Sequence, residues 1–327
     1  MPGMYTLLEA QNLIEKHIQN LAIPDTPPEL YEPVSYILSL GGKRIRPALV
    51  IMACDLFEGD VASALKPAAA IEVFHNFTLL HDDIMDRSEL RRGKPTVHIK
   101  YNENVAILSG DVMSILASRL MNQAPGVVLN LVHEVFTKTA MQVCEGQQLD
   151  MNFEELLMVS EEEYLHMIEL KTAVLIAASL KIGAILGGSS QQDAEDLYEF
   201  GRNLGLAFQL QDDLLDTFGE QDLTGKKPGT DIVDNKKTFL MIRAMDISSP
   251  AQKEELTGWL TQKEFDPREK IDAVTAIFEA LNIKEITEKR IQDFYQEALG
   301  SLEKLNRPAN RKVELLNFAS FLMTRNR

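Results

Sequence analysis

Apolar and polar residues follow one another along most of the chain with the period of an α-helix. One such pattern begins near Ala68 and meets few helix-breaking residues before Gly93 and Pro95. Its apolar positions, which recur at helical spacing, are Ile71, Phe74, Leu79 and Leu80. Because every third or fourth residue of an α-helix lies on one face, this pattern predicts an amphipathic helix.

Local signals set the limits of several further helices. Ser160 followed by Glu163 is a capping-box signature, which predicts the start of a helix that runs to Gly187. The next helix is expected to begin near Gln191 and to end before Gly219. Later helices are expected to begin near Pro250, Pro267 and Ile286, and the last one to run close to the C-terminus.

The loops between these helices are short and contain many proline and glycine residues. They lie near residues 24–28, 91–95, 222–229 and 307–308. The sequence has no sustained strand-like alternation, no glycine-rich phosphate loop after a strand and no low-complexity linker. Although 327 residues could form two domains, we expect one large all-α domain over residues 1–327.

The overall charge of the chain is strongly negative. It has 33 Lys and Arg residues against 49 Asp and Glu residues, a net charge of −16, and a pI near 4.9. Nucleic acids and anionic membranes attract surplus positive charge. Neither is therefore expected as the main partner.

The cysteines and the apolar segments indicate a cytoplasmic protein. Cys54 and Cys144 lie 90 residues apart in apolar, helix-like sequence, so we expect buried free thiols of a reducing compartment. The N-terminus lacks the basic and then apolar pattern of a signal peptide. The most apolar stretch, residues 173–186, contains Lys181 and is too short to span a bilayer, so no membrane span is expected.

Two identical acidic motifs of the pattern Asp-Asp-x-x-Asp occur in the predicted helices. They are Asp82–Asp83–Asp86 and Asp212–Asp213–Asp216. One such motif is expected about 0.07 times by chance in a chain of this length and aspartate content, so two are improbable. On a helix, the first and third carboxylates of each motif lie at i and i+4 on one face.

Both motifs stand where carboxylates are unfavourable. Each lies near the C-terminal end of a largely apolar helix, where burial, the helix dipole and repulsion between like charges all oppose negative charge. A bound cation would compensate for these effects. Oxygen ligands alone suit Mg²⁺, which keeps its waters and is often shared with substrate phosphates. The alternative for either motif alone is a solvated acidic helix end, but the pair favours a metal site.

Basic residues gather beside both acidic motifs. They are Lys43, Arg44 and Arg46 in the segment GGKRIRP (41–47), Arg91 and Arg92 after the first motif, and Lys226, Lys227, Lys236 and Lys237 after the second. Arginine captures phosphate oxygens with two parallel hydrogen bonds, and lysine acts as a movable charge. Each basic pair alone fits a solvated surface. Together with the acidic motifs, they favour a polyanion held partly through metal and partly by direct contact.

These motifs resemble those of the trans-isoprenyl diphosphate synthases, the polyprenyl synthetase family, of the short-chain farnesyl and geranylgeranyl type. The segments that carry the resemblance are GGKRIRP (41–47), LLHDDIMDRSELRRGKPTVH (79–98), EGQQLD (145–150), KTA (171–173), FQLQDDLLD (208–216) and GKKPGTDIVDNKKT (225–238). They occur in order between about residues 40 and 240. The resemblance implies an all-α bundle around a central active-site cavity, usually as a homodimer.

The resemblance also implies an activity and a set of site residues. The activity is Mg²⁺-dependent head-to-tail condensation of isopentenyl diphosphate with dimethylallyl, geranyl or farnesyl diphosphate, with about three ions and C15–C20 products, leaning to geranylgeranyl. The implied metal-binding residues are Asp82, Asp83, Asp86, Asp212, Asp213 and Asp216, with Asp150 beside Gln147 as an auxiliary contact. The residues implied to bind the allylic diphosphate are Arg91, Lys171, Lys226 and Lys236, and those for isopentenyl diphosphate are Lys43, Arg46, His75 and Arg92. Thr172 and Gln209 would place oxygen dipoles beside the developing allylic cation.

Three positions in or beside these motifs have alternative interpretations. A lone histidine such as His75 is usually structural, and only the family pattern gives it a binding role. His81 beside Asp82 is similar to the pattern of His-Asp phosphohydrolases, but the second motif has no matching histidine. Lys227 follows Lys226 where the family often has proline, so which of the two lysines makes the contact stays open.

Product length is expected to depend on residues that precede the first motif. Phe77 and Phe74 lie five and eight residues before Asp82, about 7–8 Å and about 12 Å along a helix. An aromatic ring there could form a floor for the growing chain. Farnesyl synthases of the family often carry aromatic residues at both the fourth and fifth positions before the motif, whereas Thr78 follows Phe77 here, as in geranylgeranyl-type sites. The alternative is that Phe77 is an ordinary core residue.

Two other functions remain open at this point. A class I terpene cyclase also uses an Asp-Asp-x-x-Asp motif with Mg²⁺, but its second motif differs and it has no use for the basic segment 41–47. A non-catalytic helical subunit of a heteromeric synthase would typically have lost one acidic motif, and both are intact here.

Overall fold

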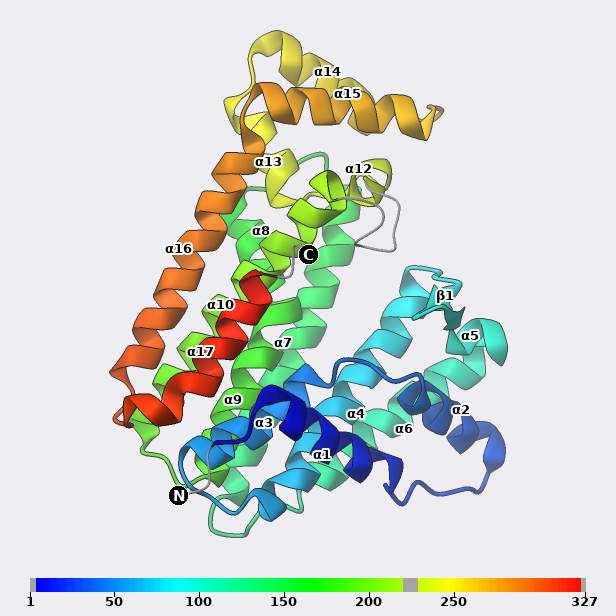
Figure 1. The fold of residues 1–327 in the computed structure, drawn as a ribbon. Helices are drawn as coiled ribbons and strands as arrows, with labels where there is room; N and C mark the ends of the chain where they lie inside the picture. Colours follow the sequence, from blue (N-terminus) through cyan, green and yellow to red (C-terminus); the bar gives the residue numbers. More distant parts are fainter. Residues whose placement is uncertain (1–3, 220–228, 325–327) are drawn as a thin grey trace. The chain divides into compact units, whose positions relative to one another are not determined.

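The computed structural model describes residues 4–219 and 229–324 and is almost entirely helical (Figure 1). Its only strands in these ranges are two residues each and pair antiparallel. The elements are α1 (Leu7–Gln19), α2 (Pro28–Ser39), α3 (Ile45–Leu56), α4 (Val61–Met85), β1 (Leu90–Arg91), β2 (Lys94–Pro95), α5 (Val97–Lys100), α6 (Glu103–Met121), α7 (Leu129–Glu155), α8 (Glu161–Ile168), the π-helical segment η1 (Glu169–Ala173), α9 (Val174–Leu186), α10 (Gln191–Phe218), α12 (Thr230–Val233), α13 (Phe239–Ile247), α14 (Pro250–Thr261), α15 (Pro267–Ala280), α16 (Ile283–Lys304) and α17 (Ala309–Met323). The all-α class predicted from the sequence is confirmed.

The helix limits follow the signals in the sequence. The Ser160 hydroxyl accepts from the Glu163 N–H and the Glu163 carboxylate accepts from the Ser160 N–H, so the predicted capping box is present. The helical run that it opens continues through α8, η1 and α9 to Leu186. α10 has the predicted limits, and Pro250 and Pro267 occupy the first positions of their helices, where a missing N–H costs nothing.

The chain forms two compact units, which are described separately. Unit 1 comprises Met1–Lys138, Ala178–Leu197 and Asn306–Leu315, and unit 2 comprises Thr139–Ala177, Tyr198–Leu305 and Leu316–Arg327. The division lies within helices α7, α9, α10 and α17. That residues 1–327 form a single domain stays a prediction.

In unit 1, α4 is the central element. It packs against α6 and α3, and α1 in turn packs on α3, while α2 packs on α6 (Figure 1). α3 is apolar apart from Arg46 and Asp55, and its residues from Pro47 to Cys54 are all buried. Since an apolar helix surface must be covered, α3 lies inside the core that supports α4.

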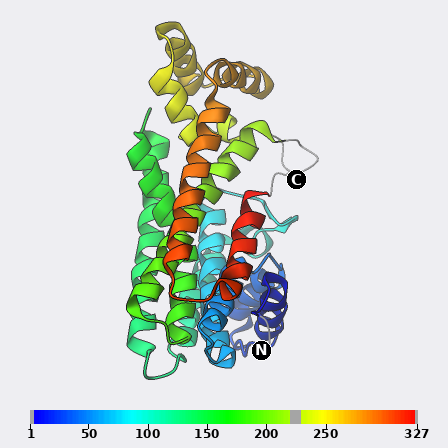
Figure 2. The same cartoon turned by 60° about the vertical axis from the view of Figure 1, so that its left-hand side comes forward.

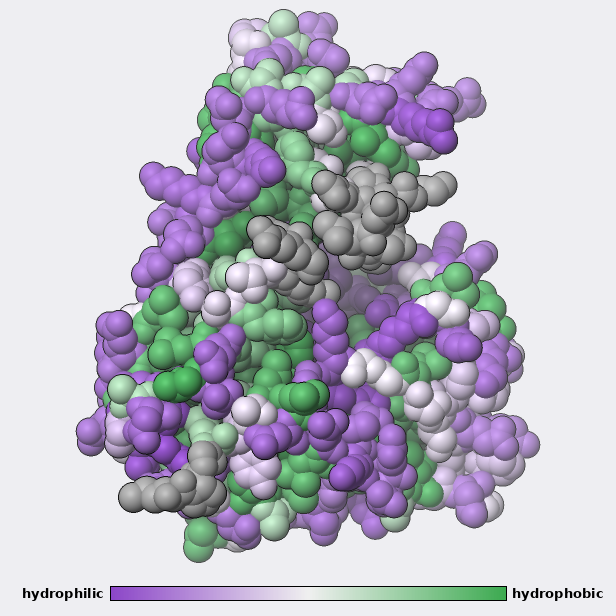
Figure 3. Space-filling view, viewed as in Figure 1, coloured by the Kyte–Doolittle hydropathy of each residue, from purple (hydrophilic) through white to green (hydrophobic). Residues whose placement is uncertain are grey.

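In unit 2, the core lies between α13 and its neighbours. α13 packs against α8, α15 and α16, and buried residues of these helices form one apolar cluster with the second half of α10. α14 and α15 form a helix pair next to the start of α16, as both views show (Figures 1 and 2). Hydrophilic side chains cover the outer end of this pair (Figure 3), so its polar face meets solvent.

One prediction about the cysteines is wrong. Cys54 is a buried free thiol on α3, as expected, and burial raises its pKa to about 12. Cys144 is also a free thiol, but it is exposed. It lies on the outer stripe of α7 with Met141 and Gln148, and a pattern of apolar residues does not show which face of a long helix is left uncovered.

α6 passes the length and composition test for a membrane-spanning helix. The mean hydropathy of its most apolar 18-residue window is 1.2, and 39% of that window is buried. Buried core helices pass the same test, so one such helix is weak evidence. Residues 4–219 and 229–324 therefore contain no clear membrane span.

A buried arginine joins four helices of unit 1. Arg44 adopts the left-handed conformation at the N-cap of α3 and is 4% exposed. Its guanidinium donates to Glu15 on α1 at 2.7 Å, to Glu72 on α4 at 2.5 Å and to the Leu38 carbonyl on α2 at 2.7 Å. Burial alone would lower the pKa of Arg44, but the two carboxylates more than offset it, and the pKa is raised.

We expect Arg44→Met to lower the free energy of unfolding by roughly 3–5 kcal/mol, because the Glu72 carboxylate would stay buried without its partner. Chemical denaturation followed by circular dichroism measures the change. Arg202→Met is the control, since Arg202 pairs with the partly exposed Glu169 and Glu199 and its loss should cost less than about 1 kcal/mol. Similar small losses in both variants would contradict this role of Arg44.

Candidate active site

The first acidic motif occupies the last turn of α4, as predicted. Asp82 and Asp83 lie within the helix, and Asp86 is its C-cap. Asp83 is 2% exposed, whereas the Asp82 side chain is 21% exposed and Asp86 is exposed. The first and third carboxylates are therefore accessible to a ligand, and the middle one is not.

Arg91 on β1 neutralises the buried middle carboxylate. Its Nε lies 2.9 Å from both oxygens of Asp83, and its Nη2 lies 2.7 Å from Oδ1 of the same residue. The same Nη2 is 3.8 Å from Asp82 Oδ2. Burial raises the pKa of Asp83, and Arg91 opposes that shift. Asp83 thus fixes a guanidinium beside the accessible Asp82.

The three cations of segment 41–47 have different surroundings. Lys43 is exposed, and Arg44 is buried in the ion pairs described above. Arg46 is partly buried, and its Nη1 lies 3.2 Å from Nε2 of His75 on α4. The structure therefore separates a structural arginine from the two cations that the family resemblance assigns to a diphosphate.

His75 is held neutral among arginines. Burial first, and then the charges of Arg46, Arg92, Arg91 and Arg44, lower its pKa well below 6.5. A neutral imidazole can accept the hydrogen bond of Arg46. The exposed Arg92 guanidinium donates to the Gly41 carbonyl in the same region. His75, Arg46 and Arg92, which the sequence assigns to one diphosphate, are thus brought together in a positively charged part of unit 1.

Aromatic side chains line α4 before the first motif. Phe74 is buried and Phe77 is partly exposed, and their ring centroids are 5.5 Å apart. Phe136 of α7 meets Phe74 edge to face at 5.5 Å. The His81 ring meets Phe77 in the same way at 4.8 Å, and its Nε2 lies 3.2 Å from the Ile107 carbonyl. His81 thus belongs to the aromatic row, and Thr78 donates to the His75 carbonyl.

The second acidic motif repeats the arrangement of the first in unit 2. It lies in the last two turns of α10, and its middle residue, Asp213, is 5% exposed, whereas Asp212 and Asp216 are partly exposed. Asp213 accepts from the buried Tyr164 hydroxyl and from Gln209 Nε2 at 3.1 Å. Burial and the neighbouring Asp231 raise the pKa of Asp213 to about 7. Asp216 accepts from the Asp231 N–H at 2.9 Å.

Two of the remaining candidates of unit 2, Lys171 and Thr172, lie on η1. Lys171 Nζ donates to Asp150 Oδ2 on α7 at 2.5 Å, and Thr172 Oγ1 donates to Gln209 Oε1 on α10 at 3.1 Å. Lys236 is largely exposed, 3.4 Å from Asp231. Lys226 and Lys227 lie outside the described residues, so the choice between them stays open.

Comparison with known proteins agrees with these motifs. Residues 27–278 match the family model described as polyprenyl synthetase. The geranylgeranyl diphosphate synthase of Methanosarcina mazei is 43% identical over 235 residues, which cover 71% of this chain and 72% of that protein. The short chain isoprenyl diphosphate synthase of Methanothermobacter thermautotrophicus is 37% identical over 327 residues, with 99% of both proteins covered. A crystal structure of a geranylgeranyl pyrophosphate synthase matches with a TM-score of 0.94 and 41% identity, over 98% of this chain and 99% of that one.

This chain belongs to the polyprenyl synthetase family. It is a short-chain prenyltransferase of the trans type, as the sequence motifs predict, with the all-α fold of its relatives. The match begins before the basic segment and ends beyond the second acidic motif, so it includes every site residue predicted from the sequence.

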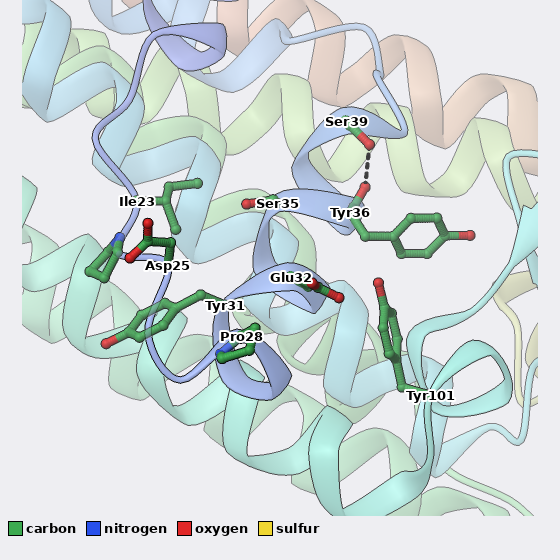
Figure 4. A pocket seen from close by; sticks show the side chains of 10 residues that line it. Ile23, Asp25, Pro28, Tyr31, Glu32, Ser35, Tyr36, Ser39 and Tyr101 are labelled. Carbon is green, nitrogen blue, oxygen red and sulfur yellow. Dashed lines mark hydrogen bonds between the residues drawn. The ribbon is translucent and has the colours of Figure 1, made fainter.

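One surface cavity of this polyprenyl synthetase contains none of the predicted site residues. It has a volume of about 560 Å³ and is lined mainly by α2 and the loop before it, with Tyr101 after α5 (Figure 4). Its lining includes Asp25, Tyr31, Glu32 and Tyr36, and the motif residues lie elsewhere. Within the described parts of the chain, no three His, Cys, Asp or Glu side chains form a metal site by themselves.

Three features that shape this synthetase's site could not be predicted from the sequence. Tyr164 binds Asp213 from a position in α8 that carries no motif, and Arg44 differs from its basic neighbours only in its burial. The π-helical geometry of η1 also has no pattern in the sequence. Each of these features arises from contacts between residues far apart in the chain.

The neutral state of His75 predicts a pH dependence of stability. The pKa of His75 is lower in the folded chain than in the unfolded chain. At a pH between these two values, the unfolded chain therefore binds one more proton than the folded chain. The free energy of unfolding therefore decreases as the pH falls below about 6.5, by up to about 1.4 kcal/mol per pH unit. His75→Gln should remove this contribution, as measured by chemical denaturation between about pH 5 and 8. If the free energy of unfolding depends on pH identically in the wild type and in His75→Gln, His75 is not held neutral.

Proposed function

We propose that this enzyme condenses isopentenyl diphosphate head to tail with allylic diphosphates to give short-chain trans-prenyl diphosphates, chiefly geranylgeranyl diphosphate. The observation that carries the proposal is on α4. This helix bears the accessible carboxylates Asp82 and Asp86 at its end and, seven residues before Asp82, the neutral His75 that holds Arg46. An acidic metal-binding end and a basic anion site on one helix suit two diphosphates at a fixed separation. The names of the M. mazei relative and of the matching crystal structure support the geranylgeranyl product.

The carboxylates of the two motifs fit Mg²⁺. Asp82, Asp86 and Asp212 offer accessible oxygens, with Asp216 and Asp150 beside them, and oxygen ligands of this kind suit an ion that keeps waters and shares phosphates. About three ions are proposed, bound by the carboxylates of the two motifs. When bound, Mg²⁺ would neutralise the charge that develops on the diphosphate leaving group. The buried Asp83 and Asp213 would keep the donors and neighbouring carboxylates in place.

Basic side chains would bind the two diphosphates, and polar side chains would face the allylic cation. Arg91, Lys171 and Lys236, with Lys226 or Lys227, would bind the allylic diphosphate, so that its C–O bond ionises against fixed positive charge. Thr172 and Gln209 would direct oxygen dipoles toward the allylic cation. Lys43, Arg46, His75 and Arg92 would bind the isopentenyl diphosphate.

The proposed reaction needs no nucleophilic side chain. The double bond of isopentenyl diphosphate attacks the allylic cation, and the new C–C bond replaces the broken C–O bond. A proton then leaves the intermediate, with the departing pyrophosphate as the acceptor. The products are the lengthened prenyl diphosphate and protonated pyrophosphate.

We further propose that the enzyme works as a cytoplasmic homodimer. α6 exposes Ile107, Leu108 and Ile115, with exposed fractions of 39%, 59% and 66%, along one stripe of unit 1. An exposed apolar stripe of this kind fits a self-complementary contact with a second copy of the chain.

A direct assay tests the proposed activity. The purified full chain is incubated with Mg²⁺, isopentenyl diphosphate and, in separate reactions, dimethylallyl, geranyl or farnesyl diphosphate. We expect pyrophosphate release that requires both substrates, and linear products of up to about twenty carbons. Cyclic hydrocarbons from the allylic diphosphate alone would favour a terpene cyclase, and no reaction in any mixture would contradict the proposal.

Asp82→Ala should lower turnover by at least about a hundredfold at saturating Mg²⁺, because an accessible carboxylate beside Arg91 is lost. Steady-state pyrophosphate release measures kcat. Asp293→Ala removes an exposed aspartate of α16 and serves as the control, with wild-type turnover expected. Near-normal turnover of the Asp82 variant would contradict the metal-binding role proposed for the first motif.

Phe77→Ala should lengthen the products, because it removes the partly exposed ring that lies before the first motif and beside His81. Chromatography of the dephosphorylated products measures chain length. Phe321→Ala removes an exposed ring of α17 and should leave the product distribution unchanged. If Phe77→Ala also leaves it unchanged, Phe77 has only a packing role.

A further inference from the structure

The π-helical segment η1 presents two candidate site residues to two different helices. A π turn inserts an extra residue into a helix and often marks a functional position. Here Lys171 meets Asp150 of α7, and the next residue, Thr172, meets Gln209 of α10. All of these residues belong to unit 2.

Each of the two partner helices approaches η1 through a glycine. Gly146 lies four residues before Asp150 on α7, and a Cβ added to it would lie 2.3 Å from the Lys171 backbone nitrogen. Gly205 lies four residues before Gln209 on α10, and a Cβ there would lie 2.6 Å from Ala173 Cα. Because residues four apart lie on the same helical face, each glycine and its polar partner meet η1 together.

These contacts leave no room for a side chain. In both cases the nearest opposing atom belongs to the backbone, and the Ala173 Cβ that also faces Gly205 is fixed to the backbone, so neither can rotate away as a flexible side chain can. Restoring an ordinary contact distance would move a helix or η1 by about 1 Å, and a displacement of that size can cost about a hundredfold in rate at a catalytic centre. The bonds of Lys171 to Asp150 and of Thr172 to Gln209 would be stretched by the same movement.

We propose that Gly146 and Gly205 are positioning residues that fix Lys171 and Thr172 for the allylic substrate. This inference rests on the proposed function, in which Lys171 binds the allylic diphosphate and Thr172 faces the allylic cation. The two glycines act through close backbone contact, and neither touches substrate. The patterns Gly-x-x-x-Asp on α7 and Gly-x-x-x-Gln on α10 give the same arrangement, a glycine four residues before the polar partner of η1.

The test compares Gly146→Ala and Gly205→Ala with two matched controls. Gly258→Ala and Gly300→Ala also place alanine within helices, α14 and α16, but the added Cβ has no atom within 4 Å. Steady-state assays with full-length protein measure kcat and the KM of each substrate, and circular dichroism confirms that each variant is folded. We expect kcat/KM for the allylic diphosphate to fall at least about tenfold in both site variants. The KM for isopentenyl diphosphate should change less than about twofold, and the controls should match the wild type.

The possible outcomes separate this inference from the proposed function. An active wild type with unchanged kinetics in both site variants would overturn the positioning role alone. Equal changes in both KM values, or failure of both site variants to fold, would overturn it in favour of a general structural role. Because the two glycines lie on different helices, one folded site variant is enough for the kinetic comparison. An inactive wild type would overturn the proposed function and this inference with it.

Discussion

Negative charge concentrated at helix ends must be balanced, and the site residues of this synthetase depend on how the chain meets that requirement. In each acidic motif the middle carboxylate is buried and satisfied by the chain's own donors. Arg91 pairs with Asp83, and Tyr164 and Gln209 bind Asp213. An unpaired buried carboxylate would be too costly to keep ionised, so these partners are required for the motifs to exist in a folded core. The outer carboxylates are partly or largely exposed.

The same ion pairs also determine where positive charge lies in unit 1. Arg91 neutralises Asp83 and, by doing so, stands beside Asp82. Arg44 forms ion pairs with Glu15 and Glu72, and these buried contacts anchor the segment that carries Lys43 and Arg46 to α4. Burial, and then the charges of the surrounding arginines, lower the pKa of His75 and keep it neutral, so it can accept from Arg46 without adding charge of its own. Structural ion pairs and candidate ligands thus alternate along one short stretch of sequence.

Much of this arrangement could be predicted from the sequence, because helical periodicity, caps and acidic spacing are local properties. The capping box at Ser160, the limits of α10 and the position of both motifs in last turns are of this kind. The burial of Arg44, the Tyr164 bond to Asp213 and the exposure of Cys144 could not be predicted, since each depends on which distant helix covers a given face. The π-helical segment η1 likewise has no local signal in the sequence, and it lies where α7 and α10 approach Lys171 and Ala173 through Gly146 and Gly205.

We propose that the two acidic motifs hold metal ions for the allylic diphosphate. A crystal structure of the full chain grown with Mg²⁺ and an unreactive thio-analogue of farnesyl diphosphate tests it most directly. We expect metal ions bound to Asp82 and Asp86 of the first motif and to Asp212 of the second, with diphosphate oxygens among the ligands of these ions. A diphosphate coordinated by a single motif, with the other motif free of both metal and phosphate, would contradict it.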